Sequence, residues 1–339
     1  MPSEFALIER YFTRPVNQTV LGVGDDGAIV RPSPGMELVI STDMLVAGTH
    51  FLADTDPAAL GWKTLAVNVS DLAAMGAQPR WALLAAALPA ARAADEAWIA
   101  AFAEGFFQCA EAFGIDVIGG DTTRCVNDAM NFCVTIFGEA PSGRALLRSG
   151  AKPGDEIWVS GAPGRAALGL AQRQGRCSLA EPQLSACVNA LDRPQPRVAL
   201  GLALALGGLA TAAIDVSDGL LADLGHVLER SRVAATLHFA RLPDAALQCG
   251  AGVDAPLAQD CLLAGGDDYE LVFTALPIHH AKIAALSTTL DLPLACIGQI
   301  ESGLTGQLRL LDAAGQPLTQ TRRGYDHFAQ NPSEQDPAQ

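Results

Sequence analysis

Aspartates recur beside Gly, Ser or Thr at widely separated points of the chain. The motif Val69-Ser70-Asp71-Leu72 recurs in similar form as Val216-Ser217-Asp218-Gly219-Leu220, and Asp215 directly precedes this second occurrence. Carboxylates without His or Cys partners select hard, oxygen-loving ions, which means Mg²⁺ or Mn²⁺. If these carboxylates converge, their mutual repulsion requires such a cation. The residues predicted to bind divalent ions on this basis are the pair Asp25 and Asp26, together with Asp43, Asp71, Asp121, Asp215 and Asp218.

The helix that carries Asp71 is predicted between Asp56 and Gly76. Asp56 followed by Pro57 is typical of a helix start, and Gly76 is a plausible stop. Apolar residues recur at helical spacing and form a stripe, while Asn68 and Asp71 share another face. A solvated polar face is the simplest interpretation of that second face. The repeated Val-Ser-Asp phrase favours a shared site instead.

Several of the other aspartates are predicted where a strand ends. The strand 37–43 closes on Ser41-Thr42-Asp43, and the strand 115–118 runs into Gly119-Gly120-Asp121. Ligands of α/β proteins gather at such strand ends, although a loop start explains the first case equally well. The two glycines would let a ligand approach the backbone, whereas a tight turn leaves Asp121 unexplained. The strand 212–216 delivers Ser217 and Asp218 at the start of a helix over 220–231, so that Asp215 and Asp218 can face one ion.

Other motifs are weaker when taken alone. An ordinary Asp-Gly turn is the better interpretation of Gly22 to Ala28, and His50 by itself is more simply a surface or packed histidine. Gly161-Ala162-Pro163-Gly164 precedes a helix from Arg165 and could cradle phosphate. It lacks the Gly-Lys-Ser/Thr ending of a Walker A loop, so a structural turn is an equal alternative.

The remaining pattern predicts an α/β chain of two domains. Helices are expected over 4–12, 95–113 and the first part of 198–214, which is uncharged but interrupted by Gly207-Gly208 and too short to span a membrane. Gly- and Pro-rich turns over 141–155 mark the boundary, so the domains are 1–140 and 147–328. The polar end, 329–339, is predicted to be disordered. Further strands are expected over 28–30, 81–88, 131–137, 156–160, 271–275 and 294–300.

Composition excludes several classes of partner. The net charge of -15 argues against a surface for nucleic acid or an anionic membrane, since both need clustered Lys and Arg. Anionic ligands would therefore need metal ions as mediators. The eight cysteines are scattered without a C-x-x-C pair, which fits thiols of a reducing compartment. Charged residues interrupt the first apolar run, unlike a signal peptide, so a cytoplasmic location is expected.

Taken together, these phrases resemble the thiamine-monophosphate kinase family of the aminoimidazole-ribonucleotide synthetase-like superfamily. The resemblance runs nearly the whole chain apart from its polar end. Its motifs are E-F-A-L-I-E-R-Y-F, G-V-G-D-D, S-T-D-M-L-V-A-G-T-H-F, L-A-V-N-V-S-D-L-A-A-M-G-A, I-G-G-D-T-T, R-S-G-A-K-P-G-D, A-I-D-V-S-D-G-L, G-G-D-D-Y-E-L and G-Y-D-H-F. Two departures are a shorter carboxylate at Asp267, where relatives commonly carry Glu, and Ala103 at about the position where some carry a Tyr beside adenine.

The resemblance implies an enzyme that transfers the γ-phosphoryl group of ATP to thiamine monophosphate, assisted by several Mg²⁺ ions. It implies a two-domain α/β (α+β) fold whose N-terminal sheets pair into a dimer barrel, giving a homodimer. Asp71, Asp121 and Asp218 would be catalytic, and the nucleotide contacts would be Gly120, Asp121, Arg148 and Ser217. The acceptor would contact His50, Asp267 and Tyr325. The implied metal ligands are Asp26, Ser41, Thr42, Asp43, Asp71, Asp121, Asp215 and Asp218.

Two rival functions stay open at this point. One is another ATP-dependent enzyme of the same superfamily; a selenophosphate synthetase would need a Cys or selenocysteine and a Lys near the N-terminus, and none precedes Lys63 and Cys109. The other is a non-catalytic Mg²⁺- or nucleotide-binding module. Release of ADP in the presence and absence of thiamine monophosphate distinguishes these functions.

Overall fold

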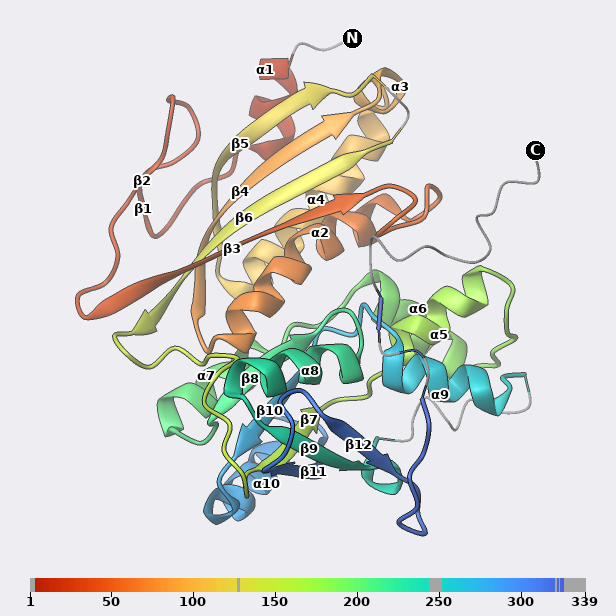
Figure 1. The fold of residues 1–339 in the computed structure, drawn as a ribbon. Coiled ribbons are helices and arrows are strands. Elements are labelled where there is room, and N and C mark those ends of the chain that lie inside the picture. The colour runs from red at the N-terminus through yellow and green to blue at the C-terminus, as the bar shows by residue number, and fades with distance from the viewer. Residues whose placement is uncertain (1–3, 127–128, 244–251, 321, 323, 326–339) are drawn as a thin grey trace.

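The computed structural model describes residues 4–126, 129–243, 252–320, 322, 324 and 325. Within them a four-stranded sheet lies in the N-terminal half and a six-stranded sheet in the C-terminal half, with a two-stranded ribbon at the N-terminal edge (Figure 1). The predicted disordered end, 329–339, lies outside the described residues. None of the helices within the described ranges is long and apolar enough to cross a membrane.

The N-terminal sheet has the order β3-β6-β4-β5, and only its β4–β5 pair is parallel. Helices α2 and α4 pack on one face and form a single core with it. The elements of this half are α1 (Glu4–Leu7), η1 (Ile8–Phe12), β1 (Thr19–Leu21), β2 (Ile29–Val30), β3 (Met36–Val46), α2 (Pro57–Ala74), β4 (Gln78–Leu88), α3 (Ala90–Ala93), α4 (Glu96–Phe113), β5 (Asp116–Arg124) and β6 (Asn131–Pro141).

Helix α2 begins as predicted, because the Asp56 carboxylate accepts a hydrogen bond from the Ala59 N–H at 2.9 Å. It crosses α4 so closely that a Cβ on Gly61 would lie 2.0 Å from the Phe102 carbonyl oxygen. Its polar side chains are also buried, including Asn68. The helix contacts both sheets and therefore lies between the two halves (Figure 1). Its polar face is an internal surface, not a solvated one.

The C-terminal sheet has the order β12-β9-β11-β7-β10-β8 and is antiparallel except for β12–β9. One face packs against α5, α6, α8 and α9, and the other against α7 and α10. The elements are β7 (Glu156–Ser160), α5 (Arg165–Arg173), α6 (Gln183–Asp192), α7 (Val198–Gly207), β8 (Ala212–Val216), α8 (Leu220–Ser231), β9 (Ala234–His238), η2 (Phe239–Arg241), α9 (Ala255–Ala264), β10 (Glu270–Ala275), η3 (Pro277–His279), α10 (His280–Thr289), β11 (Leu294–Glu301) and β12 (Leu308–Leu311).

Two predicted strand ends are wrong. Strand β3 continues to Val46, and β5 continues through Gly119 and Gly120 to Arg124, so Asp43 and Asp121 lie within strands. Pairing with a long neighbour is the reason: β3 pairs with β6 over its whole length, and β5 follows β4 to Leu88. A ladder of backbone hydrogen bonds outweighs the local turn preference of glycine. The predicted helix 4–12 is also divided into α1 and the π-helix η1.

Candidate active site

A cavity of about 310 Å³ lies where the two halves meet. Strand β3 and helix α2 bring Asp43 and Asp71 to it, and the loop after β8 brings Asp218. A second cavity of about 420 Å³ shares two of its lining residues, Asp71 and Asp215, with the first. Of the residues implied by the sequence, the first cavity contains Asp43, His50, Asp71, Asp215, Ser217, Asp218, Asp267 and Tyr325, and the second adds Ser41 and Arg148.

Side chains of α2 and β3 orient carboxylates that come from α2 itself and from the two sheets. Asp71 accepts a hydrogen bond from the Ser41 hydroxyl at 2.5 Å, and it also shares a hydrogen bond with Asp43. One residue earlier on α2, Ser70 donates to Asp215 Oδ2 at 2.7 Å. Helix α2 is therefore the element that brings these acidic groups together.

Asn68, one turn before Asp71 and Leu72 on α2, fixes the backbone of β3. Its Oδ1 accepts the Asp43 N–H at 3.0 Å, while its Nδ2 donates to the Thr64 carbonyl oxygen at 3.3 Å. Both polar ends of this buried amide are thus used within the protein. We assign Asn68 a positioning role, which the sequence indicated only by placing it on the same helical face as Asp71.

The carboxylates of this cluster are difficult to ionise together. Burial is the main cause that raises the pKa of Asp43 to about 7, and Asp71 and Asp215 add to it. Burial likewise raises the pKa of Asp215 to about 7, with a further contribution from Asp71. Burial also raises the pKa of Asp71, although Ser41 and the positive charge of Arg148 act in the opposite direction. An all-oxygen set with this much unbalanced negative charge fits a hard divalent cation.

The loop that carries Asp218 is held by a residue that the sequence motifs did not identify. Asp223, in the first turn of α8, is buried, and its Oδ2 accepts the backbone N–H groups of Ser217, Asp218 and Gly219 at 3.0, 3.1 and 3.1 Å. Burial, reinforced by Asp215 and Asp218, raises its pKa to about 8. An acidic residue in the first turn of a helix was the available signal.

Asp267 faces the first cavity from the loop before β10. Its Oδ2 pairs with Lys63 Nζ at 3.0 Å, and its Oδ1 accepts the Tyr269 hydroxyl at 3.0 Å. Lys63 is buried on α2, with only 3% of its side chain exposed. A buried ammonium normally needs a paired carboxylate, so this contact holds Asp267 in place. The sequence did not identify Lys63, because a single lysine within a helix carries no recognisable pattern.

The other carboxylates of the Gly-Gly-Asp-Asp-Tyr-Glu motif have structural partners. Asp268 accepts the N–H groups of Gly164 and Ala166 at 2.6 and 3.2 Å, at the start of α5. Glu270 pairs with Arg197 through two hydrogen bonds of 2.5 and 2.7 Å. The glycine loop 161–164 is therefore a turn whose N–H groups bind a carboxylate of the protein itself, which decides between the two predicted alternatives in favour of structure.

His50 and Tyr325 approach the cavity from opposite ends of the chain. His50 Nδ1 accepts the Val46 N–H at 3.0 Å, which directs its Nε2 away from that backbone contact. The Tyr325 N–H donates to the Asp218 carbonyl oxygen at 2.9 Å. Both side chains are at least partly accessible, and 44% of Tyr325 is exposed. They can therefore contact a ligand that enters from solvent.

Four implied site residues line neither of the two cavities in the part of the chain that the structure describes. Asp26 lies in an exposed turn. Thr42 lies next to Thr135 on the outer face of the N-terminal sheet, and the strand register places Asp121 on that same face. Gly120 packs against β4, where a Cβ would lie 1.8 Å from the Leu84 carbonyl oxygen. Any side chain at position 120 would therefore collide with the neighbouring strand, which explains the glycine.

Comparison with known proteins identifies the family of the chain. Residues 24–140 match the model of the AIR synthase related protein, N-terminal domain. The thiamine-monophosphate kinase of Escherichia coli K12 is 44% identical over 332 residues, which cover 96% of this chain and 98% of that protein. The chain belongs to the thiamine-monophosphate kinase family.

Solved structures of this family have the same fold. The thiamine-monophosphate kinase from Stenotrophomonas maltophilia K279a superposes with a TM-score of 0.79 at 43% identity, covering 92% of this chain and 95% of that one. AaThiL, complexed with AMPPCP and TMP, superposes with a TM-score of 0.73 at 28% identity, covering 96% and 97%. The predicted α/β superfamily fold is confirmed.

Proposed function

We propose that this chain is an enzyme that transfers the γ-phosphoryl group of ATP to thiamine monophosphate and so forms thiamine diphosphate. The observation that carries the proposal is the convergence of Asp43, Asp71, Asp215 and Asp218 from both halves on one cavity. It is supported by relatives named thiamine-monophosphate kinase and by AaThiL, whose structure holds an ATP analogue together with TMP. Both ligands of that relative correspond to the two substrates proposed here.

We propose that several Mg²⁺ ions occupy this site. The fitting residues are the oxygen donors Ser41, Asp43, Asp71, Asp215 and Asp218, and burial together with the mutual repulsion of the carboxylates raises the pKa of Asp43. When bound, the ions would neutralise the phosphate charges and align the two substrates. The carboxylates would hold the positive charge of the ions in a fixed place. Helix α2 in turn fixes Asp215 through Ser70 and the backbone of Asp43 through Asn68.

The acceptor needs no general base, because a phosphate monoester is largely ionised at neutral pH. The chain's contribution is therefore to bind and orient two polyanions for in-line transfer. Arg148 lines the second cavity beside Asp71 and Asp215, where its guanidinium can meet phosphate oxygens. His50, Asp267 and Tyr325 line the first cavity and would contact the thiamine part. Asp267 is rigid there because Lys63 and Tyr269 hold it.

We propose that the chain works as a homodimer paired through the outer face of its N-terminal sheet. Strand β3 exposes apolar side chains on that face, including Ile40 and Met44, of which 57% and 55% are exposed. A stripe of this kind is costly unless it is covered. Asp26, Thr42, Gly120 and Asp121 line neither cavity within a single described chain, so their proposed contacts with metal or nucleotide require this pairing.

Light scattering on two matched variants tests the dimer. Ile40→Lys should halve the mass at micromolar concentration, whereas Ile278→Lys, at a residue that is 80% exposed on the C-terminal half, should leave it unchanged. A wild-type monomer at that concentration contradicts the dimer. We also propose a domain boundary between 140 and 147, and a cytoplasmic location that fits the scattered cysteines.

A coupled assay of ADP release tests the reaction. We expect release that depends on both thiamine monophosphate and Mg²⁺, and that stops after chelation. Release with another acceptor but not with thiamine monophosphate would favour a different enzyme of the superfamily. Binding of Mg²⁺ and ATP without turnover would favour a non-catalytic module, and undiminished activity after exhaustive chelation would refute the metal assignment.

A further inference from the structure

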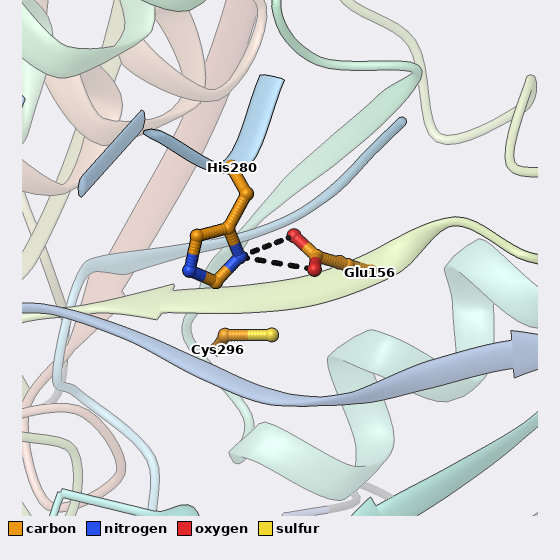
Figure 2. A group of neighbouring side chains, drawn as sticks. All are labelled: Glu156, His280 and Cys296. Atoms are coloured by element: carbon orange, nitrogen blue, oxygen red, sulfur yellow. Dashed lines mark hydrogen bonds and ion pairs between the residues drawn. The ribbon is translucent and has the colours of Figure 1, made fainter. Parts of the chain in front are cut away.

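Glu156, His280 and Cys296 form a compact group of potential metal ligands in the C-terminal half (Figure 2). They come from the start of β7, the start of α10 and the strand β11, so residues far apart in the sequence meet here. One ligand atom of each lies within 4.8 Å of the others. His280 Nδ1 is 2.9 and 3.0 Å from the two carboxylate oxygens of Glu156. The group thus combines an imidazole, a carboxylate and a thiol.

Neighbouring residues orient these ligand atoms. Strand pairing places Cys296 opposite Trp158, which lies on the same face of β7 as Glu156. The Trp158 indole N–H donates to Glu156 Oε2 at 3.1 Å, and its ring lies 4.9 Å from the imidazole of His280. Such outer contacts fix the orientation of metal ligands in proteins. One rigid aromatic side chain therefore fixes both the carboxylate and the ring.

We propose that Glu156, His280 and Cys296 bind one Zn²⁺ ion. A set with one sulfur, one imidazole nitrogen and one carboxylate oxygen is typical of Zn²⁺, whereas Mg²⁺ requires oxygen ligands. Tetrahedral ligands about 2.0 to 2.3 Å from the ion are roughly 3.4 Å apart. The His280 and Glu156 atoms are already closer than this, so it is the separation from Cys296 Sγ, at most 4.8 Å, that needs to shorten, by no more than about 1.4 Å. His280 has the freedom to move, since 52% of its side chain is exposed.

The fourth position of the ion faces solvent and would hold water, because the three residues supply only three ligands and His280 is at the surface. Binding releases the thiol proton of Cys296 and any proton on His280 Nδ1 to solvent. None of the three residues lines either cavity of the candidate active site, and α10 and β11 lie on the side of the C-terminal half that is away from the N-terminal sheet (Figure 1). The proposed zinc site is therefore separate from the phosphoryl-transfer site.

A competition experiment between the full chain and a chromophoric zinc chelator tests the proposed zinc site. Millimolar Mg²⁺ is present throughout to occupy the active-site carboxylates. We expect one Zn²⁺ per wild-type chain, with the dissociation constant raised about tenfold or more in Cys296→Ser and in His280→Ala. Co²⁺ in place of Zn²⁺ should give a thiolate charge-transfer band that is absent in Cys296→Ser.

Two control variants are matched to the ligands. The side chain of His226 is 52% exposed, as is that of His280, and it lies beside Glu229. His226→Ala therefore tests whether any surface His–Glu pair binds the ion. Cys133 is half-buried on a strand like Cys296, so Cys133→Ser tests whether any thiol suffices. Both should keep Zn²⁺ and the Co²⁺ band, and thermal melts should show all four variants folded. The proposal would be overturned if the wild-type chain retained no Zn²⁺ in the presence of Mg²⁺, or if folded Cys296→Ser retained as much Zn²⁺ as the wild type. His280 and Glu156 would then be an ordinary ion pair.

Discussion

Replacing Asp71 by Asn separates metal chemistry from stability. The amide oxygen can still accept the Ser41 hydroxyl, but the carboxylate charge beside Asp43 and Asp215 is lost. A unit charge pair about 4 Å apart is worth about 4 kcal/mol at an effective dielectric constant of about 20. The other carboxylates of the site retain part of the attraction for the cation. We therefore expect a loss of about 3 kcal/mol in the transition state, which lowers kcat by about 10²-fold or more.

The stability of Asp71→Asn should change in the opposite direction. Removing one of several buried like charges relieves repulsion, so the metal-free variant should melt no lower than the wild type. Asp116 supplies the matched control, because it is a buried carboxylate that accepts hydrogen bonds from Asn17, Gln18 and Thr19 outside both cavities. Asp116→Asn should lower the melting temperature and leave kcat nearly unchanged.

The assay is ADP release at saturating ATP and thiamine monophosphate over a range of Mg²⁺ concentrations, with thermal melts of the same preparations. Asp71→Asn should need more Mg²⁺ for half-maximal activity and should not recover wild-type kcat at any concentration. A near-normal kcat, or a melting temperature that falls as far as that of Asp116→Asn, would show that Asp71 is a structural residue and that the metal assignment is wrong.

Three further predictions follow from the same site. Asp43 and Asp215 have folded-state pKa values of about 7, above the unfolded value of about 3.9. Protonation of these two carboxyls therefore stabilises the folded protein at low pH, and this stability is lost as the pH rises from about 4 to 7. Because the carboxylates are ionised at pH 8, thermal melts should show more stabilisation by Mg²⁺ at pH 8 than at pH 5, and equal stabilisation would contradict this. Tyr325→Ala should mainly raise KM for thiamine monophosphate in steady-state assays, with kcat and KM for ATP little changed, and a weaker ATP affinity instead would oppose its assignment. Lys63→Met should also raise KM for thiamine monophosphate. The free-energy change calculated from KM for the double variant Lys63→Met/Asp267→Asn should be smaller than the sum for the two single variants, and an additive result would show that the ion pair does not position Asp267.

Local signals predicted several elements to the residue. Strands β7 and β8 and helix α8 have their predicted bounds, and α4 differs only at its capping residue, Asp95. Each combines a clear apolar pattern with a cap or turn at its ends, which are interactions between near neighbours in sequence. Strands β9 and β12 and helices α6, α9 and α10 were not predicted. Their boundaries depend on packing in the C-terminal half.

The sequence by itself determined the family, the all-oxygen chemistry of the proposed donor set and the candidate ligands Asp43, Asp71, Asp215 and Asp218, because carboxylates and their flanking Gly and Ser are local features. Only the tertiary structure decided how those residues meet. It made the polar face of α2 an internal surface, extended β3 and β5 past their predicted ends, and turned Thr42 and Asp121 to the opposite face of the sheet. Strand pairing and burial involve partners far away in the chain, and a side chain's face within a sheet follows from its register with those partners.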